Sequence, residues 1–153
     1  MHDRRAHHVG QQPAGEPVVL RNPDAVRPWQ HVLNPLSGYL VLAEALLETG
    51  AGSGFDDAWN FGPVAGDEQP VSWVVERVRE RWPELDARVE PDADAGKESP
   101  LLRLDSAKAR ERLEWAPRWD LAAGLDATIE WFRAHAAGED ARAATLRQIR
   151  TFA

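Results

Sequence analysis

The stretch of sequence that decides the fold is RNPDAVRPWQHVLNPLSGY, residues 21–39. Pro28 biases Arg27 away from the helical region of the backbone, so the first half of the stretch is expected to be extended. We predict an edge strand or strand-like loop over 26–32, because proline cannot donate a hydrogen bond to a central strand ladder. A short β-type run at 17–20 precedes it and is separated from it by turn residues.

The second half of the stretch predicts the start of a helix. Asn34 is expected as the N-cap and Pro35 at the first helical position, a pairing that helix starts favour. Gly50 is expected to end this helix. Apolar residues at helical spacing give the helix one hydrophobic stripe, made of Leu36, Tyr39, Leu40, Ala43, Leu46 and Leu47.

Further along the chain, short apolar runs alternate with helical periods. A short buried strand is predicted over 57–63, where Gly62 and Pro63 stop it. The other expected elements are a helix over 71–82 closed by Pro83, a short strand at 88–90, an extended run at 101–104, a helix capped by Asp105, a helix capped by Asp120, and a weakly amphipathic helix over 138–153. The sequence therefore predicts a small α+β unit with short strands and about four helices.

Composition divides the chain into three parts. Residues 1–16 are polar, contain three histidines and are expected to form a disordered or atypical N-terminal tail. Histidines can hold a metal ion, but a polar histidine-rich tail usually stays solvated, so no metal site is predicted. Residues 17–136 are expected to form the folded domain, and residues 137–153 a C-terminal helical tail.

Composition and charge exclude several classes of function. Of the 153 residues, 43% are hydrophobic and 28% are charged, which is typical of a globular protein. A net charge of −7 argues against binding nucleic acid through bulk electrostatics. Without cysteine there is no disulfide, thiol nucleophile or cysteine-based zinc site, as expected in a reducing cytoplasm. No membrane helix or secretory signal is predicted, so we expect a cytoplasmic location.

Standard catalytic and nucleotide-binding motifs are missing from this sequence. It has no Gly-x-Gly-x-x-Gly after a strand, no phosphate loop and no Gly-x-Ser-x-Gly elbow. The best candidate site residue is Arg27, held in a stiff extended segment between Val26 and Pro28. A guanidinium presents a planar fork that matches two phosphate oxygens, so Arg27 is a candidate anion-binding residue. The alternative is that it pairs with one of the 25 acidic residues.

Four motifs, in order along the chain, resemble the substrate-binding part of a known enzyme family. They are residues 21–32 with 35–39, then Trp59-Asn60-Phe61-Gly62-Pro63, then Leu104-Asp105-Ser106-Ala107-Lys108-Ala109, then Leu113-Glu114-Trp115-Ala116-Pro117 with Leu125, Thr128, Ile129, Trp131 and Phe132. From Pro17 to about His135, the chain resembles the C-terminal part of the extended short-chain dehydrogenases/reductases, the NAD-dependent epimerase/dehydratase family. Pro28 and Gln30 make it most similar to the CDP-glucose 4,6-dehydratase branch.

The resemblance implies a binding site for a nucleotide sugar, CDP-glucose, within 17–136. By resemblance, Arg27 would hold the diphosphate and Asn60 would help to position it. Arg21 is a weaker candidate, placed near the same anion only by its neighbourhood. The family reaction also uses a Tyr-x-x-x-Lys pair, but the single tyrosine, Tyr39, is followed four residues later by alanine. No catalytic residue is therefore predicted in this chain.

The resemblance further implies NAD as the cofactor of the full-length family, bound by a Gly-rich half that this chain lacks. We therefore expect the chain alone to bind no NAD, to be inactive, and to pair with a dinucleotide-binding half or form a homo-oligomer. An inner face around Trp29, Trp59 and Phe61 is expected to be exposed. Two alternatives stay open: a fragment of a related nucleotide-sugar epimerase or dehydratase, and a non-enzymatic helical module that binds protein partners.

Overall fold

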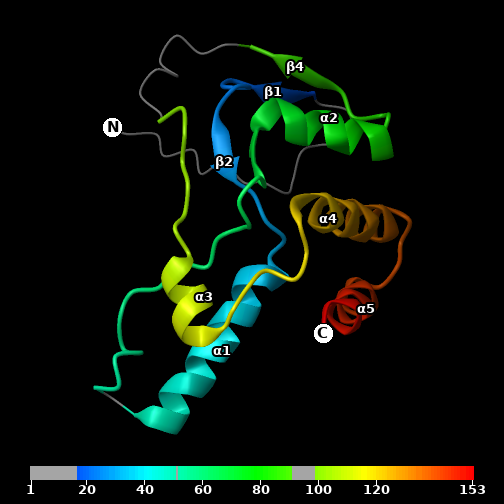
Figure 1. Cartoon of the computed structure of the whole chain (residues 1–153). Helices are drawn as coiled ribbons and strands as arrows, with labels where there is room; N and C mark the ends of the chain where they lie inside the picture. Colours follow the sequence, from blue (N-terminus) through cyan, green and yellow to red (C-terminus); the bar gives the residue numbers. More distant parts are fainter. Residues whose placement is uncertain (1–16, 51, 91–98) are drawn as a thin grey trace, which may run out of the picture.

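The computed structural model describes residues 17–50, 52–90 and 99–153 (Figure 1). In these residues the chain is α+β, with five helices and four short strands. The small sheets and helix α2 (Val71–Arg81) lie at one end of the molecule, and α1 (Leu33–Thr49) with α3 (Ala107–Leu113) lies at the other (Figure 1). The predicted fold class is therefore confirmed, while the expected tail at 1–16 lies outside the described residues.

The strands form two separate two-stranded sheets. Strand β1 (Val18–Leu20) pairs in parallel with β4 (Ala87–Val89). Strand β2 (Val26–Pro28) pairs antiparallel with β3 (Glu68–Pro70), with Arg27 opposite Gln69. Sheets this short add little stability by themselves, so packing of the helices must hold them in place.

Two further helices form a layered pair beside α2. Helix α4 (Leu121–Ala136) packs against α2 on one side and against α5 (Ala141–Phe152) on the other. Asp120 caps α4 as the sequence predicts, because its carboxylate accepts a hydrogen bond from the Ala123 backbone amide at 2.8 Å. None of the helices in the described ranges is long and apolar enough to cross a membrane.

The core lies between α1 and α3. Phe61, Ala109 and Trp115 are buried together, and the Phe61 ring meets the Trp115 ring edge to face at 5.0 Å. Gly38 allows this packing, since a Cβ built there would lie 2.2 Å from the Phe61 ring. The side of α1 that carries Val41 and Leu42 also packs against this cluster.

The predicted helix start at Asn34 is wrong. Helix α1 begins at Leu33, after Val32, and no side chain caps it. Asn34 is instead fully buried inside the first turn. Its amide nitrogen donates to the Trp119 carbonyl at 2.8 Å, and its amide oxygen accepts from the backbone amides of Arg118 and Trp119 at 3.1 and 3.3 Å. The local rule assigns the Asn34 side chain to a helix cap. In the structure this side chain instead hydrogen-bonds to the backbone of Trp119, 85 residues further along the chain.

The predicted strand over 57–63 is also wrong, because none of these residues is assigned to a strand. A strand needs a neighbouring backbone to complete its ladder. Here the segment is held by other bonds: the Gly62 amide donates to the Ser106 hydroxyl at 2.7 Å, and the Asn60 side chain donates to the Asp105 carbonyl at 3.2 Å. The segment therefore lies beside the start of α3 rather than in a sheet.

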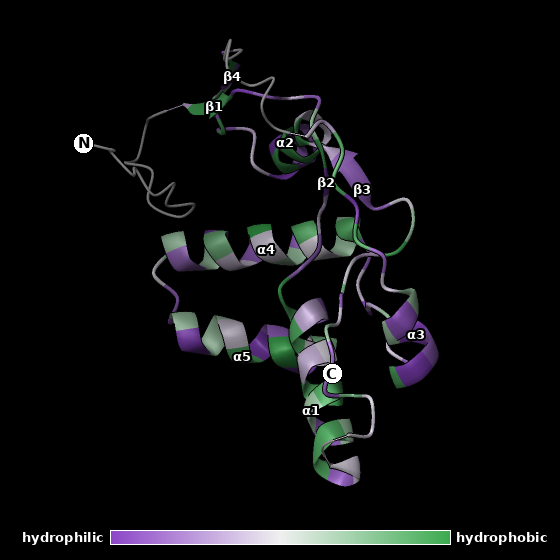
Figure 2. Cartoon of the chain, turned by 90° about the vertical axis from the view of Figure 1, so that its left-hand side faces the viewer, coloured by the Kyte–Doolittle hydropathy of each residue, from purple (hydrophilic) through white to green (hydrophobic). Residues whose placement is uncertain are grey.

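The apolar surface does not lie where the sequence predicts it. Phe61 is only 6% exposed, because Trp115 and α1 cover it, and Trp29 and Trp59 are half-buried. Several of the large exposed apolar side chains lie on α1, and others lie on β1, on β4 and in the segment 101–104. Figure 2 shows α1 with partly hydrophobic colouring beside the largely hydrophilic α3.

Candidate functional site

Arg27 lies in the middle of β2 and is half-buried. Its Nη1 donates to the carbonyls of Val26 and Ser99 at 2.9 and 3.0 Å. The strand pairing and the flanking Pro28 fix the backbone of this residue. The backbone of Arg27 is therefore held in place, and the anion-binding role expected from the sequence stays a prediction.

Asn60 lies on the other candidate segment and is exposed. Its Nδ2 donates to the Asp105 carbonyl, so the side chain is held against the start of α3. The next residue, Phe61, enters the core. Asn60 is thus an exposed amide on an anchored backbone.

Two hydrogen bonds tie the Arg27 strand to its surroundings. Gln30, three residues after Arg27, donates its side-chain amide to the Phe61 carbonyl at 2.6 Å. Trp29 donates its indole N–H to the Gln69 carbonyl at 2.9 Å. The backbone segments that carry Arg27 and Asn60 are therefore connected through Gln30. The two side chains themselves donate to different carbonyls, of Ser99 and Asp105.

Arg21 stands apart from this connection. It is exposed at the bend that follows β1. It does not line either of the two cavities described in the structure, and neither do Arg27 and Asn60. The three predicted residues are therefore surface or half-buried groups that lie outside both of these cavities.

A cavity of about 340 Å³ opens between the start of α1, α4 and α5. Its walls are mainly apolar, with His31, Trp131, Phe132 and Ile149 among the lining residues. Sequence reasoning missed this cavity, because α5 carries only a weak apolar pattern. Two polar residues, Gln30 and His31, stand directly before an apolar helix in the sequence. This pattern is the sequence feature that could have indicated the cavity.

His31 is buried at the edge of this cavity. Its Nδ1 accepts from the Leu33 amide at 3.3 Å, and its ring meets the Trp119 ring at 4.9 Å between centroids. Burial lowers the pKa of His31, and a hydrogen bond with the Gln148 side chain opposes part of that effect. The neutral imidazole is the form that this packing favours.

A cluster of aromatic rings and cations holds the loop before Asn60. Trp59 stacks on Phe55 with 5.9 Å between ring centroids, and the Lys108 ammonium lies 4.4 Å from the centre of a Trp59 ring. Lys108 also forms an ion pair with Asp57, which lowers the pKa of that carboxyl group. These contacts explain Lys108 as a structural residue of α3, as its place in the sequence indicates.

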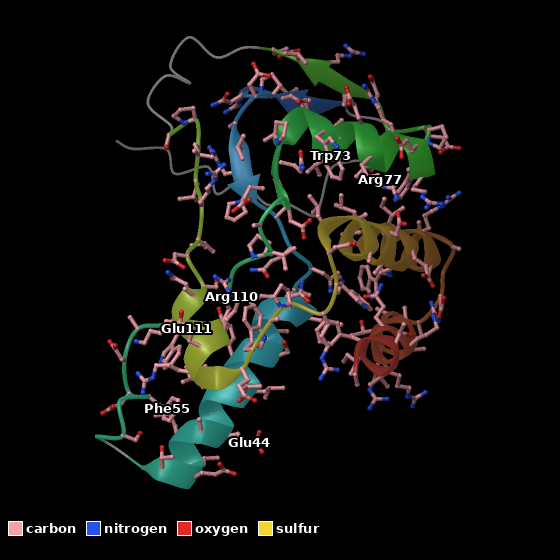
Figure 3. All side chains as sticks on the ribbon, viewed as in Figure 1. Glu44, Phe55, Trp73, Arg77, Arg110 and Glu111 are labelled. Atoms are coloured by element: carbon pink, nitrogen blue, oxygen red, sulfur yellow. The ribbon has the colours of Figure 1, made fainter. Side chains whose placement is uncertain are left out.

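A second charged cluster joins α2 to α4. Arg77 projects from α2 on the side that faces α4 (Figure 3). It donates to the carboxylate of Asp126 on α4 at 3.3 Å. Arg81 donates to the same carboxylate at 3.0 Å. Because each arginine here has a carboxylate partner, the cluster fastens two helices and does not resemble a binding site.

The residues present do not fit a nicotinamide cofactor of the family type. Tyr39 has Ala43 in place of lysine four positions on, and its ring packs edge-on against Phe61 at 5.5 Å. No group of histidine, cysteine or carboxylate side chains suitable for a metal ion occurs in the described ranges. The sequence therefore offers no Tyr-x-x-x-Lys pair for acid–base chemistry.

Comparison with known proteins gives one informative match. No protein-family model matches the sequence. Over 132 residues, or 86% of this chain, it is 39% identical to CDP-glucose 4,6-dehydratase of Salmonella typhimurium. The resemblance to CDP-glucose 4,6-dehydratase is thereby confirmed. The chain covers 36% of the length of that relative, an extent consistent with a C-terminal part of such an enzyme.

Proposed function

We propose that this chain is the sugar-nucleotide-binding part of a CDP-glucose 4,6-dehydratase and that CDP-glucose is its ligand. The observation that carries the proposal is the 39% identity to a CDP-glucose 4,6-dehydratase across 86% of the chain. The site includes the motif around Arg27 and the motif around Asn60, whose backbones Gln30 connects.

In this proposal Arg27 holds the diphosphate of CDP-glucose. Its guanidinium is carried by a paired strand, so little conformational entropy is lost when it binds an anion. Asn60 positions the ligand from its anchored backbone, and Arg21 adds positive charge from the bend after β1. Arg27 and Asn60 are binding residues, and none of the three acts on the sugar chemically.

The complete enzyme would convert CDP-glucose to CDP-4-keto-6-deoxyglucose. In that complete enzyme, NAD⁺ would supply the hydride acceptor for oxidation at C4 and the hydride donor at C6, once water has been lost across C5–C6. On this proposal NAD⁺ would be held by a dinucleotide-binding half, because the sequence given has no Gly-x-Gly-x-x-Gly loop and no Tyr-x-x-x-Lys pair. On this proposal the chain alone binds the nucleotide sugar without turning it over. Formation of 4-keto-6-deoxy product by the chain with CDP-glucose and NAD⁺ would contradict it.

Calorimetric titration tests which nucleotide sugar the chain binds. CDP-glucose is expected to bind the chain more tightly than dTDP-, UDP- or GDP-glucose. Preference for another base would instead assign the chain to a related nucleotide-sugar epimerase or dehydratase. A chain that is folded by circular dichroism and binds none of the four would overturn the proposal.

Substitution of Arg27 tests the proposed contact between its guanidinium and the diphosphate of CDP-glucose. Losing a hydrogen bond from a charged group costs about 1.5–3 kcal/mol, so Arg27→Ala is expected to raise Kd by about tenfold or more. Arg27→Lys keeps the charge without the planar fork and should weaken binding less. The matched control is Arg150→Ala on α5, which removes an exposed arginine and should leave Kd unchanged.

A further inference from the structure

The orientation of the Asn60 side-chain amide follows from its contact with the segment before α3. Its Nδ2 donates to the Asp105 carbonyl at 3.2 Å. In the reverse orientation Oδ1 would face that carbonyl, and two acceptors repel one another. Within residues 17–50, 52–90 and 99–153, no hydrogen bond reaches Oδ1, and Asn60 itself is exposed. Asn60 therefore has an acceptor oxygen available at the surface.

The surroundings of Asn60 also favour a hydrogen-bond donor over an anion. The Asp105 carboxylate is exposed and accepts from the Ala107 amide at 2.8 Å. The Lys108 ammonium is paired with Asp57, so its charge is compensated. A diphosphate carries negative charge and offers acceptor oxygens, so the Asn60 oxygen and the Asp105 carboxylate would both repel it. A hydroxyl group has a proton to donate and no net charge, so it suits this position.

Asn60 and Arg27 are held at different points of one segment of the chain. Arg27 donates to the Ser99 carbonyl and Asn60 to the Asp105 carbonyl, six positions further along. The connecting residues form no helix, and Figure 1 shows them running from the small sheets to α3. Six residues span up to about 20 Å in an extended chain. The two side chains therefore suit different groups of one elongated ligand better than a single diphosphate.

A nucleotide sugar has hydroxyl groups on both sides of its diphosphate, on the ribose and on the sugar unit. We propose that Asn60 determines specificity by accepting a hydrogen bond from one of these hydroxyls through Oδ1, and that it does not contact the diphosphate. The inference rests on the proposed function, in which Arg27 binds the diphosphate of CDP-glucose. It assigns Asn60 a different group of the ligand from the one that the family resemblance implies.

Three ligands show which hydroxyl Asn60 contacts. CDP-glucose, CDP and the 2′,3′-dideoxy form of CDP are titrated by calorimetry into the chain and into Asn60→Ala. One neutral hydrogen bond changes an equilibrium constant about twofold to tenfold, so Asn60→Ala is expected to raise Kd for CDP-glucose by that factor. With a glucose hydroxyl as donor, Kd for CDP stays unchanged. With a ribose hydroxyl, Kd for CDP also rises and only the dideoxy ligand is unaffected. An equal rise with all three ligands would overturn the proposal.

A second variant separates a hydroxyl contact from a diphosphate contact. Asn60→Asp keeps the acceptor oxygens of the side chain and adds a negative charge. A carboxylate is a strong acceptor for a hydroxyl proton, so Kd for CDP-glucose is expected to be no higher than in Asn60→Ala. Beside a diphosphate, the added charge would instead raise Kd well above the alanine value, and that result would overturn the proposal.

Lys108→Ala is the matched control. It removes the ammonium that donates to the Ala58 carbonyl at 3.0 Å, so it loosens the same loop without changing the Asn60 amide. It should change Kd for CDP-glucose and for CDP by the same factor. A changed ratio between these ligands would assign the discrimination to the loop and overturn the role of Asn60.

Failure of this inference can be distinguished from failure of the proposed function. Circular dichroism first establishes that each variant is folded. If the unsubstituted chain binds no nucleotide sugar, the proposed function fails and this inference fails with it. If the chain binds CDP-glucose, Arg27→Ala weakens that binding and Asn60→Ala leaves it unchanged, only the inference about Asn60 is overturned.

Discussion

The two faces of α1 belong to one helix but have opposite environments. On the inner face, Asn34 and Gly38 are buried against Trp119 and Phe61. On the outer face, Leu40 and Leu47 are among the most exposed apolar side chains described. Hydrophobic character therefore does not decide which face makes the core here. A polar amide and a glycine pack into the fold, while these leucines stay exposed.

The largest expected effect comes from filling the close contact at Gly38. A Cβ there would lie 2.2 Å from the Phe61 ring, so Gly38→Val overpacks the core and should cost about 3 kcal/mol of unfolding free energy. Urea denaturation measures this loss of unfolding free energy. The matched control is Ala43→Val on the outer face, which should cost only about 0.5 kcal/mol through helix propensity. Equal losses of unfolding free energy in Gly38→Val and Ala43→Val would show that the two sides of α1 are packed equally tightly.

The next effect separates the two roles considered for Asn34. Asn34→Ala leaves partly buried backbone groups at Arg118 and Trp119 without their Asn34 partner and should cost about 2 kcal/mol. Asn34→Ser is the informative comparison, because serine is a good N-cap but is too short to make the three bonds. The serine variant should unfold as easily as the alanine variant in thermal melts. Wild-type stability in Asn34→Ser would restore the N-cap interpretation.

The Asn34 result also shows how far local sequence rules reach. The helix over 71–82 was predictable, because its apolar period and Pro83 are local signals and α2 ends at Arg81. Asp120 was predictable as a cap for the same reason. Asn34 was not, because its partners Arg118 and Trp119 are distant in sequence and a tertiary contact took precedence over the local preference.

A smaller and stabilising effect is expected at the end of α3. Glu114 follows this helix with φ of 51°, in the left-handed region that costs about 1 kcal/mol for a residue with a Cβ. Glu114→Gly should therefore raise the unfolding free energy by up to about 1 kcal/mol. Glu111→Gly, inside the same helix, should destabilise by about 1 kcal/mol. Destabilisation by both substitutions would contradict the assigned backbone conformation.

The smallest effect is expected on acidification. Burial lowers the pKa of His31 below its value of 6.5 in the unfolded chain, so the unfolded state binds protons more readily. The stability contributed by the neutral imidazole is complete above pH 6.5 and falls as the pH drops toward the folded-state pKa. Melting temperatures between pH 7.5 and 5.5 should therefore fall less for His31→Gln than for the unsubstituted chain. Equal slopes would contradict burial of His31.

The candidate site was predictable only in part. The stiffness of the Arg27 segment follows from Pro28, and the structure has that segment in a paired strand. The sequence did not predict that Gln30 connects this strand to Phe61, nor that the 57–63 segment lies beside α3 outside a sheet. Those contacts join residues distant in the chain, and hydrogen bonds between a side chain and a distant backbone group leave no periodic signal in the sequence.

Phosphorus NMR of CDP-glucose tests the central claim, that Arg27 binds the diphosphate of a nucleotide sugar. Both phosphorus resonances are expected to shift when the chain is added, to remain shifted with Arg150→Ala, and to return to their free positions with folded Arg27→Ala. Resonances that never move, or that move equally with Arg27→Ala, would contradict the account.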